Sequence, residues 1–476
     1  MLSSSVVALV VVLSPAQAPA QAPAQEPAPA PAVAFDKSVL DNGLEVLVHK
    51  DARLPVVCVS VWYHVGAFHE QLGKTGFAHL FEHLMFQGTP NVPGDSHMKY
   101  LEAAGSSNFN GTTDFDRTNY YECVPKNEVE LALWLESDRM AYLMNGVDQK
   151  KLDEQRLVVK NERRQAIENV PYGLAEEQLW QAMFPKEHPY YGYVIGSMAD
   201  LDRASLGDVK IFYDSYYAPS NATLALAGDL EPAEAKKLID KYFRTLPKWP
   251  KPPPRTVKPP LLDKEVRLDL VDALAQLPKV VVQYFTPASF QPDNAEMDVL
   301  AHALGTGNGA RLHQALVVDG LLAQEVTATN NSLGNVSVLT ITAVVKPGVN
   351  PEDVLNAIQS QLELLKDLPP TEEEIARAIN AVEAQALFSL QETLGRAEQL
   401  QRYNHYTGDP GYLAKDLARF RAVTPATIQA AVTTALVKER RGVLIAAPAT
   451  LKGAAPTGDA PAATPAPPAP PAQEGP

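Results

Sequence analysis

Clustered prolines set the strongest limit on how this chain can fold. Of the 40 prolines among 476 residues, six lie within residues 1–31, seven within 247–260 and nine within 448–476. The two outer stretches are also rich in alanine, and such a composition offers too little apolar surface to build a core. The central stretch is typical of a semi-rigid linker. The folded parts of the chain must therefore lie between these three stretches.

This division predicts two folded domains, residues 36–246 and residues 263–447, joined by a linker over 247–262. Residues 1–35 then form a leading spacer, and residues 448–476 form a tail. With 46% hydrophobic and 20% charged residues, the chain is globular and long enough for more than one core.

Both predicted domains mix strand and helix patterns. Strand-like runs are VVCVSVWYHVGA, NATLALAGDL, VVVQYFT, VSVLTITAVV and RGVLIAAP, and helix-like runs are LAEEQLWQAMF, EEIARAINAVEAQALFSLQETL and LARFRAVTPATIQAAVTTAL. Residues 204–229 and 423–448 also resemble each other, because each has a helix pattern that leads into a final hydrophobic strand. We therefore expect an α+β fold in which the second half repeats the first.

The most informative local pattern is the run GKTGFAHLFEHLMFQGT, residues 73–89. Read as a helix with Thr75 as N-cap and Gly88 as the stop, it separates into two stripes at 100° per residue. Apolar residues at core spacing form one stripe: Phe77, Leu80, Phe81 and Leu84. His79, Glu82 and His83 lie together on the other side, so the core does not need them.

A single histidine in such a helix is most often a packed or surface residue. Two histidines at i and i+4 project in parallel about 6 Å apart, so His79 and His83 can converge on one metal ion. Glu82 would then stand beside the open position of the metal, where a carboxylate can take a proton from water. The order H-x-x-E-H is the inverse of the H-E-x-x-H motif of zinc proteases.

A catalytic zinc site normally has three protein ligands and one water. The stretch LDEQRLVVKNERRQAIENVPYG, which is typical of a second helix ended by Pro171 and Gly173, offers Glu154, Glu162 and Glu168. Spacing alone does not choose among the three glutamates, and each could equally be a solvated charge on a helix face.

The segments HLFEHLMFQGT, VVKNERRQAIEN and PYG together resemble the pitrilysin-type (M16) zinc metallopeptidases, especially bacterial members similar to the mitochondrial processing peptidase subunits. The resemblance implies that Glu162, 79 residues after His83, is the third zinc ligand. It also implies two homologous domains, each a mainly antiparallel sheet with flanking helices, that face each other across a substrate chamber. One departure concerns a supporting carboxylate seven residues before the ligand, where this chain has Gln155.

The same resemblance assigns a substrate-binding edge strand to the segment SSNFNGTTDFDRTNYYECVP. Its residues Asn110, Gly111, Thr112 and Thr113 would pair their backbone with an extended peptide, which gives affinity without reading sequence. The alternative from the residues alone is a glycine-containing turn before a strand over residues 118–124.

The activity implied by the resemblance is that of a zinc endopeptidase with one Zn²⁺ per chain and Glu82 as the catalytic base. One alternative is a catalytically silent binding or assembly subunit, whose mark would be a broken H-x-x-E-H motif. Another is a purely structural zinc site, which would be expected to close its fourth position with a further Cys or His. The H-x-x-E-H motif is intact, and the sequence offers no further Cys or His close to it.

Active family members carry an arginine and, seven residues later, a tyrosine in the second half. The matching positions in LVVDGLLAQEV are Val317 and Gln324, which cannot supply the same hydrogen bonds. The resemblance therefore implies a heterodimer whose partner supplies the Arg/Tyr pair. A homodimer or a self-sufficient monomer is the alternative.

The remaining features limit location and partners. A net charge of −15 argues against a nucleic-acid partner. The apolar run from Val6 to Leu13 is too short to span a bilayer and resembles a signal-peptide core, although no Lys or Arg precedes it. We expect export to the periplasm or the exterior, with no transmembrane helix. Cys58 and Cys123 would then form a disulfide or remain buried thiols.

Overall fold

The computed structural model of the chain describes residues 32–106 and 108–449. The predicted signal-like segment lies outside these residues, as does nearly all of the predicted tail. Within the described part, no helix is both long enough and apolar enough to cross a bilayer. Residues 247–262 contain no helix or strand, while the exact domain boundaries stay predictions.

The first half contains a six-stranded sheet in the order β1-β2-β6-β3-β5-β4. Its strands are β1 (Asp36–Val39), β2 (Glu45–Lys50), β3 (Val56–Tyr63), β4 (Asn108–Thr113), β5 (Thr118–Pro125) and β6 (Ala222–Gly228). All neighbouring pairs are antiparallel except β2 and β6. The helices are α1 (Phe77–Leu84), α2 (Ser96–Ala103), α3 (Val129–Gly146), α4 (Gln149–Arg163), α5 (Gly173–Met183), α6 (Met198–Arg203), α7 (Leu206–Tyr216) and α8 (Pro232–Tyr242).

The second half contains a five-stranded sheet in the order β7-β11-β8-β10-β9. Its strands are β7 (Val266–Asp272), β8 (Lys279–Thr286), β9 (Ala323–Asn331), β10 (Ser337–Val345) and β11 (Arg441–Pro448). Only β7 and β11 are parallel. The helices are α9 (Asn294–Gly305), α10 (Pro351–Leu364), α11 (Glu372–Ser389), α12 (Thr393–Thr407), α13 (Leu413–Arg421) and α14 (Pro425–Ala435).

The two sheets share one topology, which confirms the predicted α+β fold with a duplicated domain. In each sheet the last strand of the half, β6 or β11, runs parallel to the first neighbour and antiparallel to the second. The equivalent strand pairs are β2 and β7, β3 and β8, β5 and β10, and β4 and β9. The helix before the final strand, α7 or α14, is the one that the repeated sequence pattern predicts.

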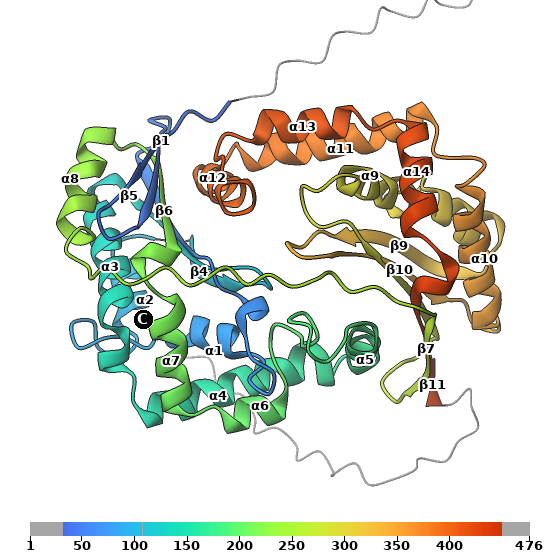
Figure 1. Cartoon of the computed structure of the whole chain (residues 1–476), viewed down its shortest axis with the longest axis horizontal. Helices are drawn as coiled ribbons and strands as arrows, with labels where there is room; N and C mark the ends of the chain where they lie inside the picture. The colour runs from blue at the N-terminus through green and yellow to red at the C-terminus, as the bar shows by residue number, and fades with distance from the viewer. Residues whose placement is uncertain (1–31, 107, 450–476) are drawn as a thin grey trace, which may run out of the picture.

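In each half, one helix packs on the sheet of the other half (Figure 1). Helix α5 follows the first-half helix α4 in sequence but packs on β7 and β11 of the second sheet, while α12 packs on β3 and β6 of the first sheet. All residues of β6 are buried, because Ala225 and Ala227 lie beneath Ala397 and Leu400 of α12. One face of each sheet is thus covered by a helix from the other half.

Two helix predictions in the second half are wrong in length. The run predicted as one helix through Leu394 breaks after Ser389, and α12 begins at Thr393 after the extended residue Glu392. The next run breaks after Arg421, because Pro425 disfavours helical geometry at the residue before it. Thr424 instead caps α14, with its side chain accepting a hydrogen bond from the backbone N–H of Thr427.

Cys58 on β3 and Cys123 on β5 face each other across the sheet and form a disulfide. Both strands contribute to the core beneath the first sheet, where Val59, Val61 and Tyr120 are fully buried. The cysteines are therefore structural, and the disulfide is the first of the two predicted alternatives.

Candidate metal centre

Helix α1 is fixed at its N-terminus by residues from two other segments. It begins at Phe77 after Gly76, whose positive φ of 85° suits glycine, so the predicted N-cap Thr75 is wrong. Thr75 instead donates both its N–H and its hydroxyl to Asp200 Oδ2, at 3.0 and 2.6 Å. The buried carboxylate of Glu70 accepts hydrogen bonds from the N–H groups of Gly76 and Ala78, at 3.0 and 2.8 Å, and so satisfies the helix end.

The two stripes predicted for this helix are present. The four apolar residues that the pattern assigns to the core are at most 4% exposed: Phe77, Leu80, Phe81 and Leu84. On the other side, the rings of His79 and His83 lie 4.8 Å apart. Their side chains keep 12% and 21% of their surface exposed, so both histidines remain accessible to solvent.

Glu162 on α4 completes a group of three donors. Its Oε1 lies 3.6 Å from His79 Nε2, and its Oε2 lies 3.3 Å from His83 Nε2. A tetrahedral site with zinc–ligand bonds of about 2.0–2.1 Å separates neighbouring ligand atoms by about 3.3 Å. The observed spacing therefore matches an edge of such a tetrahedron, and within the described residues this is the one cluster of at least three such donors.

Local packing explains why Glu162 joins the group and the other two glutamates do not. Glu154 is exposed and lies 3.8 Å from Lys150, whereas Glu168 pairs with Arg163 at 3.3 Å. Arg163 is itself buried and bridges to Glu177 on α5 at 2.6 Å. These ion pairs anchor the end of α4, which holds the neighbouring Glu162 towards the histidines.

The charge states of His79 and Glu162 suit metal binding. Burial lowers the pKa of His79 to about 4, so its ring is neutral near pH 7 and a nitrogen lone pair is available. A hydrogen bond from His83 lowers the pKa of Glu162, which keeps that carboxylate ionised. Buried Nδ1 of His79 has no hydrogen-bond partner within the described residues. Two imidazoles and one carboxylate are a donor set that fits Zn²⁺.

Glu82 is held beside this group rather than within it. It is 9% exposed, and its Oε2 accepts a hydrogen bond of 2.5 Å from the hydroxyl of Thr113 on β4. Burial raises the pKa of Glu82, while the hydrogen bond from Thr113 and the nearby His83 lower it. Gly111 allows β4 to pass this close, because a Cβ at that position would lie 3.0 Å from Glu82 Cγ.

Strand β4 is the edge of the first sheet, as predicted, and not merely a turn. Asp114 N–H donates to the carbonyl of Arg117, and hydrogen-bonded pairs alternate along an antiparallel ladder. The backbone groups of Gly111 and Thr113 therefore point away from β5, towards the open edge. Arg117 Nη1 donates to the carbonyl of Thr112, while the side-chain oxygen of Asn110 accepts from the N–H of Gly111 at 2.9 Å.

A cavity of about 680 Å³ lies between the two halves next to this edge. Phe115, Trp180 and Tyr193 are among its first-half lining residues, and Gln283 and Thr340 are among those of the second sheet. Another lining residue, Ile195, has its carbonyl against Gly76 at the start of α1. Ile195 thus connects the cavity wall to the start of α1, whereas the candidate metal ligands and Glu82 are not among the lining residues.

Sequence comparison identifies the family. The family model "Insulinase (Peptidase family M16)" matches residues 45–190, and "Peptidase M16 inactive domain" matches residues 203–382. The zinc protease PqqE of Helicobacter pylori is 30% identical over 343 residues, which cover 71% of this chain and 76% of that protein. The chain belongs to the M16 peptidase family. The resemblance inferred from the motifs is therefore confirmed.

Solved structures show that the M16 fold extends over most of the described residues. A protease from Helicobacter pylori superimposes with a TM-score of 0.81 at 26% identity and covers 88% of this chain and 100% of that one. The periplasmic protease PqqL from Escherichia coli gives a TM-score of 0.69 at 18% identity, covering 88% of this chain and 48% of that one. The second comparison supports the fold alone.

Sequence reasoning about this M16 chain missed several supporting residues. Glu70 and Arg163 hold the ends of α1 and α4, yet each is a single charged residue without a local pattern. Thr113 is predicted as a substrate-binding residue, but its side chain contacts Glu82. Val317 packs against the core of the second half, and Gln324 is exposed on β9. No sequence pattern shows these contacts, because each joins residues from different elements of the fold.

Proposed function

We propose that the chain is a zinc-dependent endopeptidase that hydrolyses peptides or unfolded polypeptide segments. The observation that carries this proposal is the convergence of His79, His83 and Glu162 at tetrahedral-edge distances, with Glu82 held beside them. Membership of the M16 peptidase family supports the same function. The intact motif argues against the alternative of a catalytically silent binding or assembly subunit.

In the proposed reaction, His79, His83 and Glu162 hold one Zn²⁺ per chain. Zinc bound there would lower the pKa of a water molecule and polarise the carbonyl of the scissile bond. Glu82 Oε2 is oriented by Thr113, which leaves Oε1 to take the proton from the attacking water. The same carboxyl group then returns the proton to the leaving amine, so no other residue of the first half is needed as an acid.

The open edge of β4 suits an extended peptide as substrate. Outward backbone groups of Gly111 and Thr113 can pair with a peptide backbone, which gives affinity with little sequence preference. The N–H of Gly111 is already bonded to Asn110 Oδ1, so this side chain must turn away when a peptide pairs there. A folded protein cannot easily present such a free strand, and we therefore expect unfolded segments and peptides as substrates.

Metal analysis combined with a cleavage assay tests the proposal. The purified chain should contain about one zinc ion and cleave a panel of unstructured fluorogenic peptides, with chelator abolishing activity and zinc restoring it. Glu82→Gln should keep the zinc and lose cleavage by several orders of magnitude, because the base is removed and the ligands remain. His83→Ala should lose both. Cleavage by Glu82→Gln near the parental rate would contradict the assignment of the base.

For location, we propose export to the periplasm or the exterior. The apolar run near the N-terminus and the Cys58–Cys123 disulfide support it, because disulfides persist in oxidising compartments. Fractionation of cells that express the full chain is the direct test, and a purely cytoplasmic chain with reduced cysteines would contradict it.

For assembly, we propose a heterodimer with a family member that supplies an Arg/Tyr pair and lacks the H-x-x-E-H motif. Support comes from Val317 and Gln324, which occupy the positions of that pair in this chain. A homodimer is the alternative. It is less favoured, because a second copy of this chain would bring no Arg/Tyr pair. Weak activity of the isolated chain, rising at least about tenfold when the partner is added, is the expected result and corresponds to about 1.4 kcal/mol. Full activity of the chain alone would refute it.

A further inference from the structure

The second half contains a cavity at the place that corresponds to the metal centre of the first half. In the duplicated topology β9 is equivalent to β4, and α9 packs on β9 as α1 packs on β4. Helix α11 packs on α9 as α4 packs on α1. These three elements, together with α12 and α13, enclose a cavity of about 570 Å³, which is within the usual range for sites of small ligands.

The side chains of this cavity do not form a metal site. Helix α9 contributes Asp298 and His302, but α11 contributes Val382 and Gln385 where the first half has its glutamate helix. Within the described residues, no group of three metal donors is found here. The cavity is nevertheless polar, and its lining includes three charged side chains, Asp298, Arg402 and Asp416.

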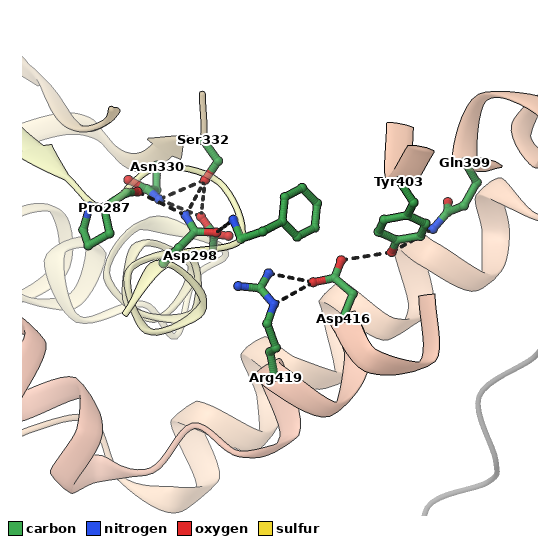
Figure 2. Close-up of polar contacts among 10 residues, drawn as sticks. Pro287, Asp298, Asn330, Ser332, Gln399, Tyr403, Asp416 and Arg419 are labelled. Carbon is green, nitrogen blue, oxygen red and sulfur yellow. Dashed lines mark hydrogen bonds and ion pairs between the residues drawn. The ribbon is translucent and has the colours of Figure 1, made fainter. Parts of the chain in front are cut away.

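Asp298 is a largely buried side chain that makes no direct ion pair among the described residues. Burial raises its pKa, while its hydrogen bonds and the more distant Arg419 and Arg402 lower it. Asn330 Nδ2 and Ser332 Oγ donate to its Oδ1 at 2.7 and 3.0 Å (Figure 2). Its Oδ2 has no hydrogen-bond partner in the part of the chain that the structure describes, and Asp298 lines the cavity. Two fixed donors therefore orient the carboxylate, and its second oxygen remains available to a ligand.

The second carboxylate of the cavity, Asp416, is already neutralised. Arg419 donates to its Oδ1 from Nε and Nη2, at 3.1 and 2.6 Å. Tyr403 donates its hydroxyl to Oδ2 at 2.9 Å (Figure 2). Asp416 thus has a complete set of partners and contributes no free charge to the cavity.

Arg402 on α12 supplies the opposite charge. Its guanidinium carbon lies 5.6 Å from the ring centre of Phe290 and 6.0 Å from that of Tyr403, and it makes no ion pair among the described residues. Arg419 lies over the same Phe290 ring at 5.1 Å. Phe290 has a positive φ of 62°, an unusual conformation for a bulky residue, and such residues are common at ligand clamps. Arg402 thus lines the cavity, and it makes no direct ion pair or hydrogen bond with an acidic side chain among the described residues.

We propose that this cavity binds a short peptide with both ends free, whose ammonium group pairs with Asp298 and whose carboxylate pairs with Arg402. A simple cation would leave Arg402 unpaired, and a simple anion would approach the unpaired Asp298. A zwitterion satisfies both charges at once, and charge-assisted hydrogen bonds of this kind are the strong ones. Peptide hydrolysis is the class of reaction that releases such ligands, but the proposal does not depend on catalysis by this chain.

Calorimetry on the full chain carrying Glu82→Gln tests this site without turnover. The probes are trialanine, N-acetyl-trialanine and trialanine amide, each titrated into zinc-loaded and zinc-stripped protein. Trialanine should bind equally well with and without zinc, and each blocked peptide should bind at least about tenfold more weakly. Asp298→Asn should remove the preference for a free N-terminus, and Arg402→Gln the preference for a free C-terminus.

Asp319→Asn and Arg440→Gln are the matched controls, because both residues are exposed in the second half and neither lines the cavity. These variants should bind like the parent. Equal binding of blocked and free peptides, binding that disappears with zinc, or no binding up to about 10 mM trialanine would each overturn the proposal. Arg402 is on the surface, so its variant remains informative if Asp298→Asn proves unstable. An inactive enzyme would refute the proposed peptidase function and leave this test intact.

Discussion

Gly111→Ala should displace the proposed catalytic base without touching the metal ligands. The added Cβ would lie 3.0 Å from Glu82 Cγ and 3.1 Å from two ring carbons of Tyr120. Carbon atoms pack at about 3.5–4.0 Å, so one neighbour must move by about 0.5 Å or more. Tyr120 is fully buried in the core, and Glu82 is therefore the residue that gives way. Because a misplacement of about 1 Å can cost about 10²-fold, we expect kcat to fall between about 10- and 100-fold.

Steady-state kinetics and zinc analysis on the same preparations measure this effect. Zinc content should stay near one per chain, because the three atoms nearest to the new methyl group belong to Glu82 and Tyr120 and not to His79, His83 or Glu162. Gly309→Ala is the matched control, since a Cβ there meets no atom within 4 Å, and it should leave kcat unchanged. Activity of Gly111→Ala within about twofold of the parent would refute the reasoning. Loss of zinc would also refute it, because the whole site would then have moved.

Three further predictions concern the metal ligand, a histidine pair and the disulfide. Glu162→Gln should weaken zinc binding far more than Glu154→Gln or Glu168→Gln, because an amide is a poorer ligand than a carboxylate; equal affinities in a competition titration would remove Glu162 from the site. His64 and His405 meet between the first sheet and α12, with Nδ1 atoms 2.7 Å apart. Burial lowers both pKa values, that of His64 to about 4. Burial of the two neutral rings therefore does not reduce the free energy of unfolding above about pH 6.5, but below that pH the free energy of unfolding falls by up to about 1.4 kcal/mol per pH unit for each histidine. In guanidinium unfolding measured across this pH range, His405→Phe should show a smaller pH slope than the parent. Equal slopes would contradict this. Replacing both Cys58 and Cys123 with alanine should lower the free energy of unfolding in urea by about 2–4 kcal/mol, and unchanged stability would show that this link does not limit the unfolded chain.

The candidate metal centre could be proposed from sequence where its geometry is local. His79 and His83 are four residues apart in one helix, so their spacing alone brings them together, and the apolar stripe fixes which way they face. Glu162 lies on another helix, and no pattern within the chain distinguishes it from Glu154 or Glu168. The family resemblance selected it, and the structure explains the selection through the Arg163 ion pairs that anchor α4.

The features that escaped prediction depend on contacts between distant segments. Periodicity indicated α5 and α12 as helices, but it carries no information on which sheet covers them. Asp298 and Arg402, two charged residues of the cavity, are separated by more than a hundred residues in the chain. In its local sequence, each resembles an ordinary charged residue on a helix surface. Helix breaks before Thr393 and Pro425 were missed because the apolar period continues across both of them.

The exchange of helices makes the metal centre depend on the second half, although that half supplies no metal ligand. Helix α12 covers the apolar residues Ala225 and Ala227, and it also satisfies polar groups of the first sheet. Ser60 Oγ donates to Glu398 Oε1 at 2.6 Å, and Asn119 Nδ2 donates to Glu398 Oε2 at 3.0 Å. Without α12, this face of the sheet would expose apolar surface and leave those groups to water. Asn119 pairs with Thr112 on the proposed substrate strand, so the contact with α12 reaches the edge that is expected to hold the peptide. The fold of each half therefore depends on a helix that the other half supplies.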